Sequence, residues 1–275
     1  MNIAQALNLR GQVDSYERQE ATWLLEHILK LSPLHLKMNM MQDLSAEQEQ
    51  HYLDGLMRLA KNEPLAYIIG SQPFWTLDLK VTSDTLVPRP DTEIVVETVL
   101  ALDLPKVANV LDLGTGTGAI ALALASEKPL WKITATDIYA PSLDVAKFNA
   151  EKHGLNNVNF ALGSWYKALM TRQHKDKFDL IVSNPPYIDP DDVHVAKLEY
   201  EPQRALVAEK KGLSDLELII RETPEWLNPK GWIVLEHGYD QATAVQDLLK
   251  QQGFKNVRTV QDYGSNDRVS LGQFV

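Results

Sequence analysis

The residues of this sequence with the most specific chemical pattern are four in a row, Asn184-Pro185-Pro186-Tyr187. The nitrogen of an amide or an exocyclic amine is a poor nucleophile, because its lone pair is delocalised into the π system. The side-chain oxygen of Asn184 and the backbone carbonyl of Pro185 can each accept one N–H of such a nitrogen. Both prolines make this acceptor geometry rigid, and Tyr187 can pack on the planar face. The pattern predicts a site for a reaction at a planar nitrogen, although Asn-Pro is also ordinary turn chemistry.

A second group forms a glycine-rich turn, Asp112-Leu113-Gly114-Thr115-Gly116-Thr117-Gly118. The glycines let the backbone approach a ligand closely, and the helix that follows offers free amide donors. The spacing also satisfies the dinucleotide fingerprint, so the turn alone leaves two ligands open. Asp112 would face a pyrophosphate with like charge, whereas it suits a ligand that carries an ammonium and a sulfonium. Asp137, at the end of the next strand, can accept hydrogen bonds from two ribose hydroxyls.

The composition limits the other chemistry that is open. The sequence has no cysteine, and its seven histidines show no metal-ligand spacing, so no metal site is predicted. The formal net charge is −10 and no cluster of lysine and arginine appears. Because phosphate contacts supply much of the affinity for DNA and RNA, this charge weighs against a nucleic-acid partner.

The length of 275 residues, with 44% hydrophobic and 23% charged residues, is ordinary for a soluble protein of one large or two small domains. The N-terminus has no basic segment followed by an apolar run. No stretch approaches the ~20 apolar residues that a membrane helix requires. We therefore expect a cytoplasmic protein that makes no use of a membrane, and we expect a monomer.

The N-terminal quarter of the chain is predicted to be a small domain of helices only, residues 1–71. Asp14-Ser15-Tyr16-Glu17 has the form of a helix start, with a capping acceptor and an acid three residues on, and Ser45-Ala46-Glu47-Gln48 is a second capping box. In residues 72–88 apolar and polar residues alternate as they do in a strand. We predict that this segment is a β-hairpin that links two domains.

Residues 89–275 are the predicted catalytic domain, in which Asp91 can cap the first helix. Strands and helices alternate from residue 107 onward. The predicted strands are 107–113, 131–137, 158–162, 178–183, 232–236, 257–261 and 269–274. This order implies an α/β fold with a mainly parallel, seven-stranded sheet, whose last two strands are antiparallel because a short turn joins them. The glycine-rich turn and the tetrapeptide both follow strands, which places both at the carboxyl edge, where such sheets bind ligands.

Together these motifs resemble those of methyltransferases that modify planar nitrogens. Two further segments, Glu63-Pro64-Leu65-Ala66-Tyr67-Ile68-Ile69-Gly70 and Leu86-Val87-Pro88-Arg89-Pro90-Asp91-Thr92-Glu93, are similar to signatures of the peptide chain release factor glutamine N5-methyltransferases (the PrmC/HemK family). The resemblance covers essentially the whole chain. It implies a class I, Rossmann-like fold with S-adenosylmethionine as methyl donor and S-adenosylhomocysteine as product.

The resemblance also implies a substrate and a set of site residues. The substrate is the glutamine of the Gly-Gly-Gln loop in class I release factors, and the N-terminal domain is expected to recognise it. Residues Gly114 to Gly118 with Asp112, Asp137, Trp165 and Asn184 are expected to bind the donor, with Trp165 near the adenine. Residues Asn184 to Tyr187 are expected to hold the glutamine amide. Relatives often carry an acid where this chain has Ser164, and the segment 208–213 also departs from the family pattern.

Three other functions remain open from the residues alone. A nucleic-acid amino-methyltransferase, acting on adenine N6 or guanine N2, can use the same tetrapeptide but needs a basic groove or a recognition domain. Asp112 and the tetrapeptide count against a dinucleotide-dependent oxidoreductase. Two intact motifs in one chain count against a binding module without catalysis.

Overall fold

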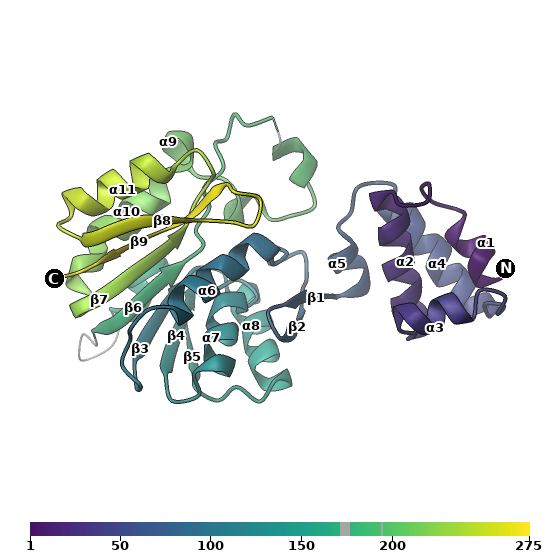
Figure 1. Cartoon of the computed structure of the whole chain (residues 1–275), viewed down its shortest axis with the longest axis horizontal. Coiled ribbons are helices and arrows are strands. Elements are labelled where there is room, and N and C mark those ends of the chain that lie inside the picture. Colours follow the sequence, from purple (N-terminus) through teal and green to yellow (C-terminus); the bar gives the residue numbers. More distant parts are fainter. Residues whose placement is uncertain (171–176, 194) are drawn as a thin grey trace. The chain divides into compact units, whose positions relative to one another are not determined.

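A computed structural model describes residues 1–170, 177–193 and 195–275, and the chain divides into two units, Met1–Ser71 and Gln72–Val275 (Figure 1). The first unit is helical. Its helices are α1 (Ile3–Leu7), α2 (Tyr16–Leu29), α3 (Pro33–Met38), α4 (Ala46–Leu59) and α5 (Leu65–Ile69).

Side-chain caps begin four of the five helices of the first unit. The side chains of Asn2, Ser15, Ser32 and Ser45 each accept a backbone N–H from the third residue of the helix that follows. The capping box predicted at Ser45 is confirmed, with the Gln48 side chain accepting the Ser45 backbone N–H in return. At α2 the cap is Ser15, since Asp14 has a left-handed backbone with φ of 68°.

The second unit holds the seven-stranded sheet, which confirms the predicted fold class. Its strands are β3 (Asn109–Leu113), β4 (Lys132–Asp137), β5 (Val158–Leu162), β6 (Phe178–Ser183), β7 (Leu227–Glu236), β8 (Lys255–Gln261) and β9 (Asp267–Gln273). They lie in the order β5-β4-β3-β6-β7-β9-β8. The first five are parallel, and β9 runs antiparallel to β7 and β8.

Helices cover both faces of this sheet (Figure 1). On one face α6 (Glu93–Leu100), α7 (Ala119–Glu127) and α8 (Ala140–Lys152) pack on strand residues such as Val110 and Val182. On the other face α10 (Ser214–Glu222) and α11 (Ala242–Gln251) pack on the alternate strand residues, such as Leu111 and Ile181. A strand buried on both faces needs apolar side chains at consecutive positions, which explains the continuous apolar runs.

Short elements complete the second unit. They are the strands β1 (Ser71–Phe74) and β2 (Leu77–Lys80), which pair with each other, the helix α9 (Glu209–Gly212), and the 3-10 turns η1 (Pro90–Thr92), η2 (Trp165–Leu169), η3 (Val195–Leu198), η4 (Gln203–Ala205) and η5 (Thr223–Glu225). The predicted cap at Asp91 is wrong. The proline-rich segment forms the turn η1 before α6, Asp91 lies inside that turn, and neither η1 nor α6 has a side-chain cap.

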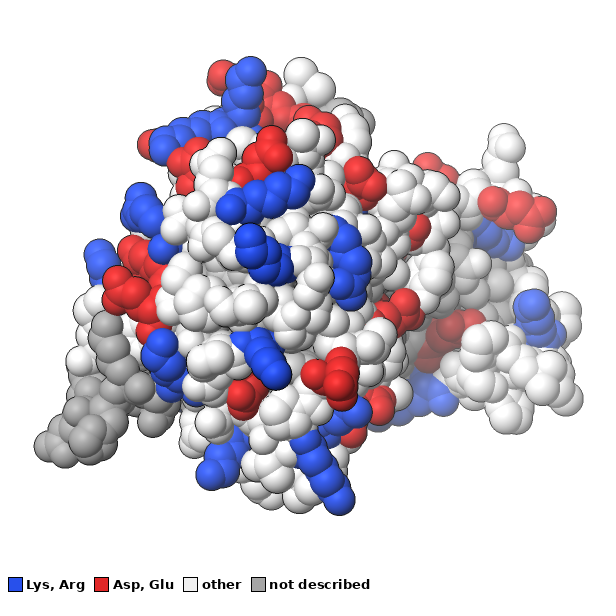
Figure 2. Space-filling model, turned by 60° about the vertical axis from the view of Figure 1, so that its left-hand side comes forward, with Lys and Arg blue, Asp and Glu red and all other residues white. Residues whose placement is uncertain are grey.

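The charges on the surface are mixed in sign. On the face that Figure 2 shows, lysine and arginine side chains are interspersed with aspartate and glutamate. Among the described residues, no helix is long and apolar enough to cross a membrane, and no three histidine, aspartate or glutamate side chains cluster as metal ligands do.

Asn149 fastens the β1–β2 hairpin to the glycine-rich turn. Its side chain is fully buried in α8. Its Oδ1 accepts the Lys80 backbone N–H at 2.7 Å, and its Nδ2 donates to the carbonyl oxygens of Lys80 at 3.0 Å and Thr117 at 2.9 Å. The hairpin, which we predicted as a linker, is therefore bonded to the second unit through its β2 strand.

We predict that Asn149→Ala lowers the free energy of unfolding of the second unit by about 3 kcal/mol, because it leaves three backbone groups without their partner. Urea denaturation followed by tryptophan fluorescence measures this loss. The matched control is Asn156→Ala, on the exposed turn after α8, which should change stability by less than about 0.5 kcal/mol. Equal stabilities for the two variants would contradict the anchoring role.

Candidate functional site

The carboxyl ends of β3, β4 and β6 open onto one cavity of about 340 Å³. Nine of the predicted site residues line it: Asp112, Gly114, Thr115, Gly116, Thr117, Asp137, Trp165, Asn184 and Pro186. Gly118, Pro185 and Tyr187 do not line it. Gly118 instead begins α7 with a left-handed backbone, and Pro185 is buried.

Asp112 brings an unpaired carboxylate oxygen to the wall of the cavity. The residue is 1% exposed, and its Oδ2 accepts the Thr115 hydroxyl at 2.6 Å. Its Oδ1 is buried and has no partner in hydrogen-bond geometry among the described residues. Burial raises the pKa of Asp112 to about 7, although the hydrogen bond from Thr115 and the nearby backbone N–H of Ala121 oppose this rise. An orphaned acceptor of this kind fits the cationic end of S-adenosylmethionine, whose ammonium would supply the missing donor.

The amides of the glycine-rich turn are already used within the protein. Gly114 and Thr115 donate to the Thr136 carbonyl at 2.9 and 2.8 Å, Gly116 donates to Asp137 at 3.0 Å, and Gly118 donates to the Thr115 carbonyl at 2.8 Å. The free amide donors that we expected from the following helix are not among these four, since α7 begins at Ala119. A pyrophosphate would need such donors, and these four amides offer it none.

Asp137 is held by the backbone on both sides of the turn. Its Oδ2 accepts the Gly116 N–H, and its Oδ1 accepts the Tyr139 N–H at 2.9 Å. Partial burial raises the pKa of Asp137, while these two amides and Arg204 oppose the rise. The carboxylate is thus fixed at the cavity wall with its remaining lone pairs available to hydroxyl groups.

Trp165 packs on the glycine-rich turn at the other end of the cavity. Its backbone φ is 45°, and a Cβ added to Gly114 would lie 3.1 Å from its ring. Glycine is required there because both the left-handed φ of 73° and the ring exclude a side chain. Asp215 also lines the cavity; partial burial raises the pKa of its carboxyl, and the nearby Trp165 indole opposes this rise. Relatives often carry an acid at the position of Ser164, next to this tryptophan. In this chain the carboxylate near Trp165 comes from Asp215 instead.

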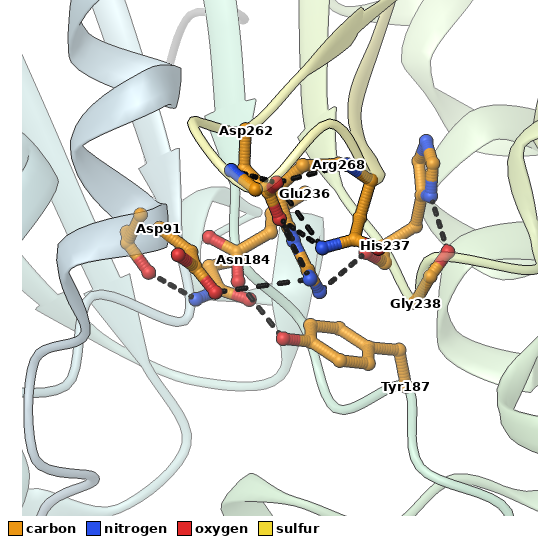
Figure 3. A network of polar contacts seen from close by, with 11 residues as sticks. Asp91, Asn184, Tyr187, Glu236, His237, Gly238, Asp262 and Arg268 are labelled. Carbon is orange, nitrogen blue, oxygen red and sulfur yellow. Dashed lines mark hydrogen bonds and ion pairs between the residues drawn. The ribbon is translucent and has the colours of Figure 1, made fainter.

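Asn184 lines the cavity with its amide oriented by a neighbour. Its Nδ2 donates to the Thr92 hydroxyl at 3.1 Å, and its Oδ1 accepts no hydrogen bond from the described residues (Figure 3). Tyr187 turns away from the cavity lining: its hydroxyl donates to Glu236 Oε1 at 2.9 Å. The expected packing of Tyr187 on a substrate and the expected role of the Pro185 carbonyl stay predictions.

Gly212, in the segment 208–213, packs directly against the backbone of the tetrapeptide. A Cβ on Gly212 would lie 2.0 Å from the Tyr187 carbonyl oxygen, and the backbone φ there is 78°. The Gln241 side chain donates to that same oxygen at 2.9 Å and to the Lys211 carbonyl at 3.1 Å. Gly212 is therefore needed so that the two loops can touch.

Two arginines, Arg89 and Arg204, also line the cavity, although the sequence motifs assign neither of them a role. Arg204 lines the cavity, donates to the Asp84 carbonyl at 2.6 Å and lies 3.7 Å over the Tyr139 ring. Arg89 forms an ion pair with Glu201, which is 3% exposed and also accepts the Val87 N–H at 3.1 Å. The sequence signal was present in the prolines beside Arg89 and Glu201, but it does not say that the two segments meet.

We predict that affinity for S-adenosylmethionine falls with pH below about 7, by up to about tenfold per unit. The cation needs the Asp112 carboxylate, and a carboxyl group with a raised pKa is protonated as the pH falls through that value. Calorimetry from about pH 6 to pH 8 measures this dependence. Asp112→Asn should bind weakly at every pH, without the slope. Asp137→Asn is the control that separates the two acids and should keep the slope. An unchanged slope in Asp112→Asn would contradict the assignment.

Comparisons with known proteins agree with this geometry. Residues 105–268 match the family described as a methyltransferase domain, and residues 3–70 match the PrmC N-terminal domain. The release factor glutamine methyltransferase of Aliivibrio fischeri is 43% identical over 274 residues, which cover 98% of this chain and 94% of that protein. The one of Salmonella typhimurium is 42% identical, with 99% and 97% covered.

The fold has solved counterparts as well. A methyltransferase from Pyrococcus furiosus superposes with a TM-score of 0.56 at 22% identity, with 80% of this chain and 98% of that chain covered. At this identity the likeness concerns the fold alone. The curated relatives, in contrast, match nearly end to end and at well above 30% identity. The chain therefore belongs to the family of release factor glutamine methyltransferases, and its methyl donor is S-adenosylmethionine.

Proposed function

We propose that this enzyme methylates the side-chain amide nitrogen, N5, of the glutamine in the Gly-Gly-Gln motif of class I peptide chain release factors. The observation that carries the proposal is the orientation of Asn184. With its Nδ2 bonded to Thr92, the side chain keeps an acceptor for a substrate N–H at the wall of a cavity that also holds Asp112 and Asp137.

The donor side of the cavity is assigned to three side chains. When bound, S-adenosylmethionine supplies an electrophilic methyl group on a sulfonium. Asp112 would pair with the ammonium of its amino-acid end through the orphaned Oδ1, and Asp137 would accept the ribose hydroxyls. Trp165 offers an aromatic face for the adenine.

The acceptor side works by positioning rather than by strong base. The Asn184 oxygen accepts one N–H of the glutamine amide, and the Pro185 carbonyl would accept the other. Both bonds strengthen as the nitrogen gives up its lone pair, because the N–H groups become more acidic in the transition state. The alkylated nitrogen is acidic enough to lose its proton to water, so these residues need no metal and no side-chain base.

The expected partner and compartment rest on the named relatives and on the surface charges. The relatives act, by name, on release factors, and the interspersed charges in Figure 2 form no basic groove on that face. We therefore expect a protein substrate, no nucleic-acid substrate, a monomer and a place in the cytoplasm. Because a cavity for one amide cannot tell one glutamine from another, the helical unit is assigned to recognition of the folded substrate.

We predict that Asn184→Ala lowers the single-turnover rate of methyl transfer by about 100- to 1000-fold while donor affinity changes little. The interaction is stronger in the transition state than in the ground state, so its loss appears in the rate. Asn184→Asp keeps an acceptor and should retain more activity than the alanine variant. Purified release factor, DNA and ribosomal RNA serve as substrates in parallel. Methylation of a nucleic acid in place of the release factor would reject the proposal, and loss of donor affinity alone would make Asn184 a donor ligand.

Removal of the helical unit should separate recognition from chemistry. We predict that a chain without residues 1–70, which keeps β1 whole, binds S-adenosylmethionine normally but methylates folded release factor at least about 100-fold more slowly at low substrate concentration. The control substrate is a short peptide that contains Gly-Gly-Gln, on which the full and the shortened chain should act equally. Equal activity of both chains on the intact release factor would assign recognition to the catalytic unit instead.

A further inference from the structure

Glu236 is a buried carboxyl group that the donor and acceptor sites do not account for. It ends β7, is 1% exposed and does not line the cavity. Its Oε1 accepts the Tyr187 hydroxyl at 2.9 Å, whereas its Oε2 is buried without a partner in hydrogen-bond geometry among the described residues. A buried acid is costly to maintain, and burial raises the pKa of Glu236 to about 7. Its place immediately behind the tetrapeptide points to a role in that loop.

Figure 3 shows Glu236 in one polar network with Asn184 and Tyr187, the two ends of the tetrapeptide. Tyr187 donates to it directly. The Thr92 hydroxyl lies near the carboxyl without forming a hydrogen bond in this geometry, and both hydroxyls hold the pKa of Glu236 below the value that burial alone would give. Thr92 is 4% exposed, and its Oγ1 accepts the Asn184 Nδ2–H at 3.1 Å. A chain of polar contacts therefore runs from Glu236 through Thr92 to the Asn184 amide.

Charged neighbours favour the ionised form of Glu236. Arg268 is the cation that faces it, and it is held by Asp262, with 3.0 Å between Nη2 and Oδ2. Asp91 opposes the ionisation, but it lies 3.7 Å from the same guanidinium group, which offsets its charge. The field of Arg268 thus supports a carboxylate at this position.

The donors and acceptors of Glu236, Thr92 and Asn184 decide in which direction hydrogen bonds between them can run. A carboxylate only accepts hydrogen bonds, and a threonine hydroxyl has a single hydrogen to donate. When Thr92 gives that hydrogen to Glu236, its oxygen offers only lone pairs to Asn184. The amide must then turn its NH₂ group toward Thr92, and its oxygen remains for the substrate.

We propose that Glu236 is a positioning residue for methyl transfer, which through the Thr92 hydroxyl selects the amide orientation of Asn184 that presents its oxygen to the substrate nitrogen. The inference rests on the proposed function, because it assigns the catalytic acceptor to Asn184 Oδ1. A carboxamide has nearly the same shape in both orientations, so packing alone does not make this choice. The flipped amide would present a donor to a nitrogen that itself carries hydrogens.

The variant that tests the direction is Glu236→Gln, which keeps the shape of the side chain but adds a donor. Its NH₂ group can donate to Thr92, whose hydrogen is then free to point at Asn184 and to stabilise the flipped amide. At about pH 8, where Glu236 is ionised in the native enzyme, we expect a single-turnover rate on release factor about 10- to 100-fold lower, with donor affinity within about twofold. Thr92→Val should show the same loss, and Thr92→Ser should restore the rate because it keeps the hydroxyl.

Two controls separate this role from a loss of packing. Thr98→Val makes the same substitution at another buried threonine, in α6, whose hydroxyl has no partner among the described residues, and its rate should equal that of the native enzyme. In the Asn184→Ala background, Glu236→Gln should cost no further rate, because no amide is left to orient. An equal rate for native enzyme and Glu236→Gln, or a loss that persists in full without the Asn184 amide, would overturn the proposal.

A readout without substrate keeps this test distinct from that of the proposed function. The Asn184 side-chain amide signal in ¹⁵N-labelled protein is assigned by its absence in Asn184→Ala. It should shift in Glu236→Gln and Thr92→Val and stay in place in Thr92→Ser and Thr98→Val. If the native enzyme methylated no release factor, the proposed function would fall while these shifts still decided the network. An unmoved signal in Glu236→Gln would reject the network whatever the enzyme methylates.

Discussion

The site depends on one hydrogen bond in the wall of the cavity, the one that the Asn184 amide donates to Thr92. A carboxamide carries a donor group and an acceptor group of similar size, and only its partners decide which one faces a ligand. The substrate nitrogen carries hydrogens and must keep its lone pair for the methyl carbon. It therefore needs an acceptor from the protein, and an NH₂ group in the same place would compete for that lone pair. The bond to Thr92 is the condition that makes the cavity suited to an amide.

Two buried acids in the second unit look alike and serve different ends. Asp112 and Glu236 are each 1% exposed, each has one oxygen without a partner in hydrogen-bond geometry among the described residues, and burial raises the pKa of each to about 7. Asp112 lines the cavity, so a cation can reach it. Glu236 does not line the cavity, and its neighbours are groups of the protein itself, among them the Thr92 and Tyr187 hydroxyls. The two acids have similar electrostatics but different access to the cavity. Asp112 can therefore bind the methyl donor, whereas Glu236 can support the tetrapeptide loop.

Local patterns predicted most of the fold. The strands Val158–Leu162 and Phe178–Ser183 agree with the prediction to the residue, because apolar side chains alternate or run between clear breaks. The strand β7 begins at Leu227, five residues before its predicted start at Trp232. The cause is an irregularity in its pairing with β6, where Leu227 pairs with Phe178 but Trp232 already pairs with Leu180. The intervening Asn228-Pro229-Lys230-Gly231 has the composition of a turn, and no local rule shows that the strand continues through it.

The candidate site was predictable only where its residues share a motif. Asp112, the glycines and Asn184 stand in recognisable segments, whereas Thr92, Asn184 and Glu236 come from three separate segments that meet only once the sheet is formed. The strand order brings β6 beside β7 and places the ends of both strands, Asn184 and Glu236, at one edge. Sequence spacing carries no signal for such a meeting.

The glycine-rich turn shows how the same local pattern can serve another ligand. In a dinucleotide site the amides of such a turn remain free for a pyrophosphate. Here the carbonyl of Thr136 and the carboxylate of Asp137 take up the amides of Gly114, Thr115 and Gly116. The backbone of the turn can still lie close to a ligand. Asp112 adds a negative charge where a dinucleotide site would present amide donors. A ligand with a positive charge and no phosphate suits such a site, because it needs few amide donors and satisfies the unpaired oxygen of Asp112.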